Sequence, residues 1–193
     1  SYQVDKKYPA IVCITPASGI KEQTAGIYAE KLAKDGFITL AFDHRTYGES
    51  GGYPRAMENA PMKVEDIKNA ISFMGTLKNV DAGNIGILGV CSGAGYGIQT
   101  AIFDQRIKSV ATVSGFIDFI NYGMSGATQY NQFLKGNKIA QLQQQIKIGN
   151  DSRQKFFETG EVVFIDGIPE KGSGLGEFWD KAADYYRNPK RGG

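Results

Sequence analysis

The chain contains the stretch Gly86-Ile87-Leu88-Gly89-Val90-Cys91-Ser92-Gly93-Ala94-Gly95-Tyr96-Gly97, in which an apolar run enters a glycine-dense turn. This pattern predicts a buried strand, a sharp turn at Cys91 and a following helix. A side chain at the tip of so tight a turn needs small neighbours two residues away on each side, and Gly89 and Gly93 supply them. Centring the turn on Ser92 would place larger residues at those positions, so Cys91 is the better candidate nucleophile.

Cysteine is chemically suited to this position. The first turn of a helix presents unpaired backbone N–H groups and the positive end of the helix dipole, which stabilise a negatively charged sulfur. The alternative is that Cys91 is a small buried hydrophobic residue between strand and helix, as free cysteines commonly are. The flanking glycines favour the nucleophile position, although that position alone does not make the residue reactive.

The composition of the 193 residues is that of an ordinary globular protein with a substantial core. The formal net charge is +2 and the basic residues are scattered, so no nucleic-acid partner is expected. The two cysteines, Cys13 and Cys91, do not indicate a disulfide framework. No apolar run is long enough to cross a membrane. We expect a cytoplasmic protein with no membrane partner; the abrupt start at Ser1 leaves a signal peptide unassessed.

Strands and helices are predicted to alternate through residue 113. Continuous apolar runs, typical of strands in a parallel sheet with both faces covered, occupy residues 8–15, 37–42, 85–90 and 107–113. Helices are predicted at 23–35, 62–77 and 92–103, with a turn at 79–84. The alternation predicts an α/β fold of three layers, α/β/α, with a parallel sheet and right-handed crossovers.

Beyond Ser114 the pattern changes. Aromatic residues lie among glycines and amides, and we predict a polar helix at 140–146, a short extended piece at 162–165 and another helix at 178–187. No linker or internal repeat divides the chain. We therefore predict one domain, with a core at 1–115 and a mostly helical, cap-like insertion at 116–193.

Three segments resemble the α/β-hydrolase superfamily, and within it the dienelactone-hydrolase-like branch. Gly89-Val90-Cys91-Ser92-Gly93 is similar to that branch's cysteine elbow. Asp43-His44-Arg45-Thr46-Tyr47-Gly48-Glu49-Ser50 is similar to the superfamily's D-x-R-G-x-G-x-S loop, except that Thr46 stands where that loop has its first glycine. Pro16-Ala17-Ser18-Gly19 lies where the oxyanion loop would be. The resemblance covers residues 8–115 well and is weaker beyond them.

The resemblance implies how the strands are ordered in the sheet. The strand at 8–15 would lie between the strands at 85–90 and 37–42. The winding of the sheet would then reverse beside Cys91, and ligands collect at such switch points.

The resemblance also implies an oxyanion hole. The backbone N–H groups of Ser92 and of Ala17 or Ser18 would point at the developing oxyanion, and one good donor is worth about 3–4 kcal/mol. An ordinary connection between strand and helix is the alternative interpretation of the Ala17 loop.

The superfamily's acid and histidine follow the nucleophile along the chain, but the single histidine, His44, precedes Cys91. Strand spacing would put the His44 loop about 10 Å from Cys91, so a supporting role is expected for it. Asp118, just after the fourth strand, is a candidate acid or a helix cap. Three explanations stay open: a partial chain whose acid and histidine lie elsewhere, which we favour; a relative that binds without reacting; or His44 as an unconventional base.

We predict hydrolysis of an ester, lactone or thioester of a small acyl substrate by attack of Cys91, with no cofactor and no metal. The alternatives are a non-catalytic binding protein or inactive fragment, and a nucleotide-binding protein. The last is disfavoured because neither G-x-G-x-x-G nor G-x-x-x-x-G-K-[ST] occurs. Without further strands, residues 107–113 would form an uncovered edge, so missing strands or another chain, as in a homo-oligomer, are expected to cover it.

Overall fold

The computed structural model describes residues 3, 5–117 and 138–191. The chain divides into two compact units, one of residues 1–117 with 189–193 and one of residues 118–188. That the core and the insertion share one domain stays a prediction. No helix among the described residues is both long and apolar enough to cross a membrane.

The first unit is built around four parallel strands: β1 (Tyr8–Ile14), β2 (Ile38–Ala41), β3 (Val80–Val90) and β4 (Ile107–Val113). Their order in the sheet is β2-β1-β3-β4. Val12 of β1 is in register with Leu40 of β2 on one side and with Ile87 of β3 on the other. The predicted strand order is therefore confirmed, and the winding reverses between β1 and β3.

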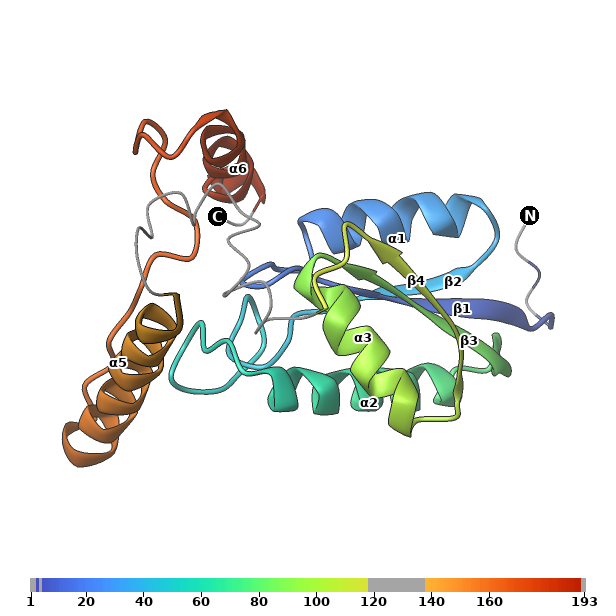
Figure 1. Cartoon of the computed structure of the whole chain (residues 1–193). Helices are drawn as coiled ribbons and strands as arrows, with labels where there is room; N and C mark the ends of the chain where they lie inside the picture. Colours follow the sequence, from blue (N-terminus) through green and yellow to red (C-terminus); the bar gives the residue numbers. More distant parts are fainter. Residues whose placement is uncertain (1–2, 4, 118–137, 192–193) are drawn as a thin grey trace. The chain divides into compact units, whose positions relative to one another are not determined.

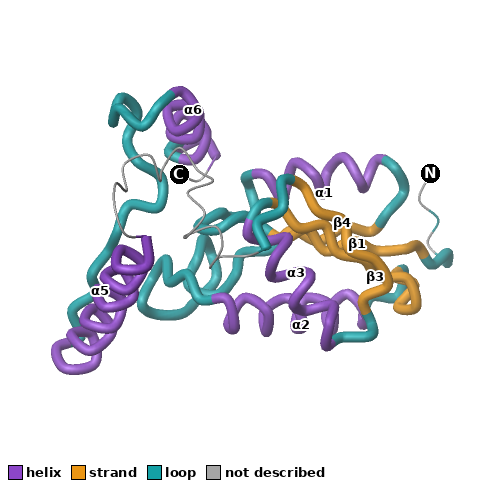
Figure 2. The backbone as a smooth tube through the Cα atoms, in the orientation of Figure 1, coloured by secondary structure: helices purple, strands orange, loops and turns teal. Residues whose placement is uncertain are grey.

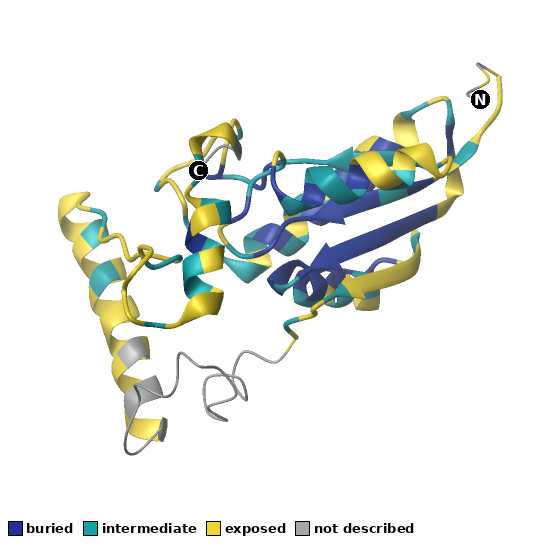
Figure 3. Cartoon of the chain, turned by 90° about the horizontal axis from the view of Figure 1, so that it is seen from above, coloured by how far each residue is buried: buried dark blue, intermediate teal, exposed yellow. Residues whose placement is uncertain are grey.

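Helices cover both faces of this sheet (Figures 1 and 2). Side chains of α1 (Thr24–Lys34) pack with Cys13 and Leu88 on one face. Side chains of α2 (Ala60–Thr76) and α3 (Ser92–Phe103) pack with the strands on the other. Figure 3 shows the central strands as the most buried part of the unit. The predicted three-layer α/β/α fold is confirmed.

The strand β3 begins earlier than expected. Residues 80–84 belong to it, so the predicted turn at 79–84 is wrong. Asp81, Gly83 and Asn84 are typical turn formers, and Asp81 accepts hydrogen bonds from the Gly83 amide (3.0 Å) and the Asn84 side chain (2.7 Å). The strand nevertheless begins at Val80, which pairs with Tyr8 of β1, with a register shift before Ala10.

The strand β4 lies at the edge of the sheet and is paired only with β3 among the described residues. Five of its seven residues are exposed. The predicted uncovered edge is thus present in the described part of the chain. What covers it stays a prediction.

The second unit contains α5 (Lys138–Thr159) and α6 (Glu177–Tyr186), and a short 3₁₀ helix, η2 (Pro189–Arg191), follows in the first unit. The helical character predicted beyond the fourth strand is confirmed for the described residues. The helix α5 runs well past the predicted 140–146, and pairs such as Lys147–Asp151 support its polar surface. Residues 162–165 lie outside the helices and strands.

Candidate active site

Cys91 lies at the sharp turn between β3 and α3. Its backbone has φ 53° and ψ −121°, which is unusual for a residue with a side chain. Three hydrogen bonds hold the turn: the Cys91 amide donates to the Val113 carbonyl (3.0 Å), and the Ala94 (3.1 Å) and Phe116 (2.9 Å) amides donate to the Cys91 carbonyl. The residue is half-buried, whereas Cys13 is buried and burial raises the pKa of its thiol to about 11. Cys91 is therefore the more accessible of the two thiols.

Two glycines allow the strand and the helix to meet so closely. A Cβ atom on Gly89 would lie 2.4 Å from the Gly93 carbonyl oxygen and 2.6 Å from Ala94 Cα. A Cβ atom on Gly93 would lie 2.5 Å from the Thr15 carbonyl oxygen and 2.8 Å from that of Ile14. The predicted need for small residues on both sides of the turn is confirmed. Gly93 also brings the start of α3 against the end of β1, where the Ala17 loop begins.

The Ala17 loop is held by two backbone amides. The Gly19 amide donates to the Pro16 carbonyl (3.1 Å), and the Ser18 amide donates to a Glu58 carboxylate oxygen (3.0 Å). Ser18 itself has φ 58°, a left-handed conformation. Among the described residues, the Ala17 amide has no hydrogen-bond acceptor, and neither has the Ser92 amide at the start of α3. Of the two donors considered for this loop, Ser18 is engaged and Ala17 is available.

His44 follows β2, two strands away from Cys91. It is fully buried, its ring lies 4.7 Å from that of Phe42, and its Nδ1 is 3.4 Å from the Asp66 carboxylate. Burial lowers the pKa of His44, which keeps the ring neutral near pH 7. The structure therefore does not bring His44 to the thiol. The candidate acid, Asp118, lies outside the described residues.

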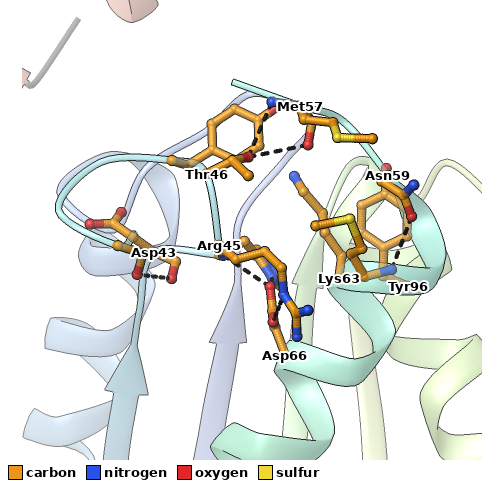
Figure 4. Close-up of polar contacts among 12 residues, drawn as sticks. Asp43, Arg45, Thr46, Met57, Asn59, Lys63, Asp66 and Tyr96 are labelled. Carbon is orange, nitrogen blue, oxygen red and sulfur yellow. Dashed lines mark hydrogen bonds and ion pairs between the residues drawn. The ribbon is translucent and has the colours of Figure 1, made fainter. Parts of the chain in front are cut away.

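Two carboxylates fix the start of the loop after β2. Asp43 accepts hydrogen bonds from the Lys21 amide and Nζ, each at 2.8 Å. A Cβ atom on Gly48, which has φ 46°, would lie 2.3 Å from the Asp43 carboxylate. Arg45 donates to Asp66 of α2 through its amide (2.9 Å) and Nε (2.6 Å; Figure 4). The loop is thereby tied to α2.

Thr46 replaces the motif's first glycine and keeps a backbone that suits glycine, with φ 74°. Its hydroxyl accepts a hydrogen bond from the Met57 amide (3.1 Å; Figure 4), and its own amide donates to the Gly51 carbonyl (2.7 Å). These bonds offset the conformational strain of a β-branched residue in this region.

A charged cluster beside the Ala17 loop was not predicted. The Glu58 carboxylate accepts hydrogen bonds from the hydroxyls of Tyr47 (2.8 Å) and Tyr96 (2.6 Å), and Lys63 Nζ lies 2.9 Å from it. Lys63 is 2% exposed and its Nζ lies 4.5 Å from the Tyr47 ring centroid. The sequence did contain one indication that Lys63 is buried: it precedes Ile67 by four residues and so lies on the apolar face of α2.

Three acidic side chains, Glu22, Asp43 and Glu49, lie close enough together to hold a metal ion. Lys21 Nζ, however, lies 2.7–2.8 Å from all three. This ammonium group supplies the positive charge that a metal ion would otherwise bring, so the four side chains form an ion-pair network.

The strand, strained turn and helix around Cys91 are those of α/β hydrolases. The solved α/β hydrolase GrgF of a Penicillium species shares the fold, with a TM-score of 0.66 at 21% identity over 87% of this chain and 53% of its own. Residues 3–166 match the X-Pro dipeptidyl-peptidase (S15) family, and the chain belongs to that family.

Three relatives illustrate the similarity. The uncharacterized protein YcjY of Escherichia coli is 39% identical, over 96% of this chain and 58% of its own. The solved hypothetical protein PA2218 of Pseudomonas aeruginosa is 30% identical with a TM-score of 0.83, over 97% and 56%. The thiohydrolase aneE of Aspergillus aculeatus is 33% identical, over 57% and 35%. The chain thus spans 35–58% of the lengths of these three proteins.

Proposed function

We propose that the protein cleaves an ester, lactone or thioester of a small acyl compound, with Cys91 as nucleophile. The proposal rests mainly on a half-buried thiol on a strained turn. The amide of Ser92, the next residue, and that of Ala17, in the loop after β1, have no acceptor among the described residues. Membership of a family of hydrolases supports the proposal, as does the thiohydrolase relative.

In the proposed reaction the deprotonated Cys91 sulfur forms a bond to the acyl carbon. The carbonyl electron pair moves to oxygen, where the Ala17 and Ser92 amides donate hydrogen bonds to the negative charge. When the carbonyl forms again, the C–O or C–S bond breaks, the leaving group takes its electron pair, and an S-acyl enzyme results.

Hydrolysis of that intermediate needs a base that activates water. The only histidine of these 193 residues is His44, which is buried two strands away, so the chain tested alone should stop at the S-acyl stage. The base of turnover would then come from outside these residues.

The first test uses p-nitrophenyl acetate, because its leaving group needs no general acid. We expect a burst of p-nitrophenolate of about one equivalent, and an intact mass increased by one acetyl group. The Cys91→Ala variant should give neither, while Cys13→Ala, which removes the buried thiol, should behave as the wild type. An equal burst from Cys91→Ala would falsify the proposal.

A second substrate examines the chemistry suggested by the family name. An X-Pro p-nitroanilide has an amine leaving group that must be protonated as it departs. We expect no release of p-nitroaniline from this chain alone. If a small acyl compound binds but no acetyl group is transferred, the protein is a binding protein.

A further inference from the structure

We infer that Glu58 is a positioning residue that holds the Ala17 loop against the nucleophile helix; this inference rests on the function proposed above. One carboxylate oxygen accepts the Ser18 amide (3.0 Å) and the other accepts the Tyr96 hydroxyl (2.6 Å). Ser18 is the neighbour of Ala17, and Tyr96 lies in α3, about one turn beyond Ser92. A single side chain therefore joins the two segments that carry the proposed oxyanion donors.

The surroundings keep Glu58 ionised. Burial alone would raise the pKa of Glu58, but Lys63, the Tyr96 hydroxyl and the Ser18 amide outweigh it, and the pKa is lowered. The Glu58 side chain is 32% exposed and that of Lys63 only 2%. Figure 4 shows Lys63 beside Tyr96, and its Nζ lies 5.5 Å from that ring's centroid. The cation thus supports a carboxylate that can accept several hydrogen bonds at once.

The tether matters because an oxyanion hole works only when its donors are in place before the reaction. A donor displaced by about 1 Å from the oxyanion can cost about 100-fold in rate. The Ala17 loop contains a left-handed Ser18, a conformation that persists only when neighbouring groups enforce it. Glu58 contacts that residue directly.

The variants are designed so that no charge is left buried and alone. Removing only Glu58 would strand the Lys63 ammonium, so both test variants carry Lys63→Met. With Glu58→Gln, the amide oxygen can accept the Ser18 N–H and its NH₂ can donate to the Tyr96 oxygen, which preserves the tether. With Glu58→Ala, both contacts are lost. The two double variants therefore have equal charge and differ mainly in the tether.

Three measurements compare the two double variants. Acetylation of Cys91 by p-nitrophenyl acetate should be about tenfold slower or worse with Glu58→Ala than with Glu58→Gln, because a donor of the oxyanion is displaced. Alkylation of Cys91 by iodoacetamide, in which no oxyanion forms, should be the same in both. Deuterium exchange of the Ser18 amide should be faster with Glu58→Ala. A structural defect at Cys91 would slow both reactions instead.

Equal acetylation rates in the two double variants would overturn the inference, and so would a parallel loss of acetylation and alkylation. If the wild type is alkylated but never acetylated, the proposed function fails. Deuterium exchange then tests by itself whether Glu58 holds the Ala17 loop. Equal protection of the Ser18 amide in the two double variants would show that it does not. Should the Glu58→Ala variant not fold, Tyr96→Phe, which breaks one end of the tether, takes its place against the wild type.

Discussion

Replacing Gly93 by alanine tests the close approach on which the candidate site depends. The new methyl group would lie 2.5 Å and 2.8 Å from the carbonyl oxygens of Thr15 and Ile14. Both are backbone atoms at the end of β1, so no flexible side chain can move aside. The start of α3 must shift away from β1, and with it the Ser92 amide.

The size of the effect follows from packing. Overfilling a well-packed site costs about 1–3 kcal/mol, and contact with fixed backbone places Gly93→Ala near the upper end. Gly75→Ala is the matched control: it lies in the same unit, exposed in α2, and its Cβ would meet nothing within 4 Å. There the change should stabilise by up to about 1 kcal/mol, the helix preference of alanine over glycine.

Thermal unfolding followed by circular dichroism measures both variants. At about 2–4 °C per kcal/mol for a chain of this size, Gly93→Ala should lower Tm by about 4–12 °C, and Gly75→Ala should raise it by up to about 4 °C. The acetylation burst should slow only in Gly93→Ala. If the two variants unfold at the same temperature, the reasoning about the turn is wrong.

Three further outcomes are expected. Glu58→Gln leaves the buried Lys63 ammonium without its partner and should cost about 3–5 kcal/mol of stability, whereas Lys63→Met should cost less. Urea unfolding compares the two variants, and a larger loss in Lys63→Met would contradict this ion-pair argument. Burial alone would raise the pKa of Asp43, but hydrogen bonds from Lys21 lower it. Its stabilisation should therefore be present above about pH 4 and lost as the pH falls further, and Asp43→Asn should flatten this dependence in unfolding measured from about pH 2 to 5. Thr46→Val loses the hydroxyl but keeps the backbone strain, so its free energy of unfolding should fall by about 1–2 kcal/mol. Thr46→Gly relieves the strain and should stay within about 1 kcal/mol of the wild type. Equal losses in the two variants would refute the strain argument.

Much of the fold could be predicted because its signals are local. The apolar runs of β1 and β4 and the glycines around Cys91 each fall within a few residues, and the resemblance supplied the strand order. The start of β3 could not be predicted, because Asp81 and its neighbours favour a turn and the pairing of Val80 with Tyr8, where the strand begins, is not visible in the local sequence.

The supports of the candidate site were less predictable because their partners are distant in sequence. Glu58 lies forty residues from Ser18 and 38 from Tyr96. No periodicity links such positions, so the choice between the Ala17 and Ser18 amides could not be made from the sequence. The geometry settles only which amide is engaged; the role of Ala17 stays a proposal.

The hydrogen bonds of the Cys91 backbone couple the thiol to the rim of the sheet. Its amide donates to the last residue of β4, and its carbonyl accepts from Phe116 just beyond. Outer strands open locally at a lower free energy than whole domains unfold. Transient opening of β4 would therefore break the hydrogen bonds that hold the turn at Cys91. The reactivity of the thiol should then depend more on the local stability of β4 than on the global stability of the protein.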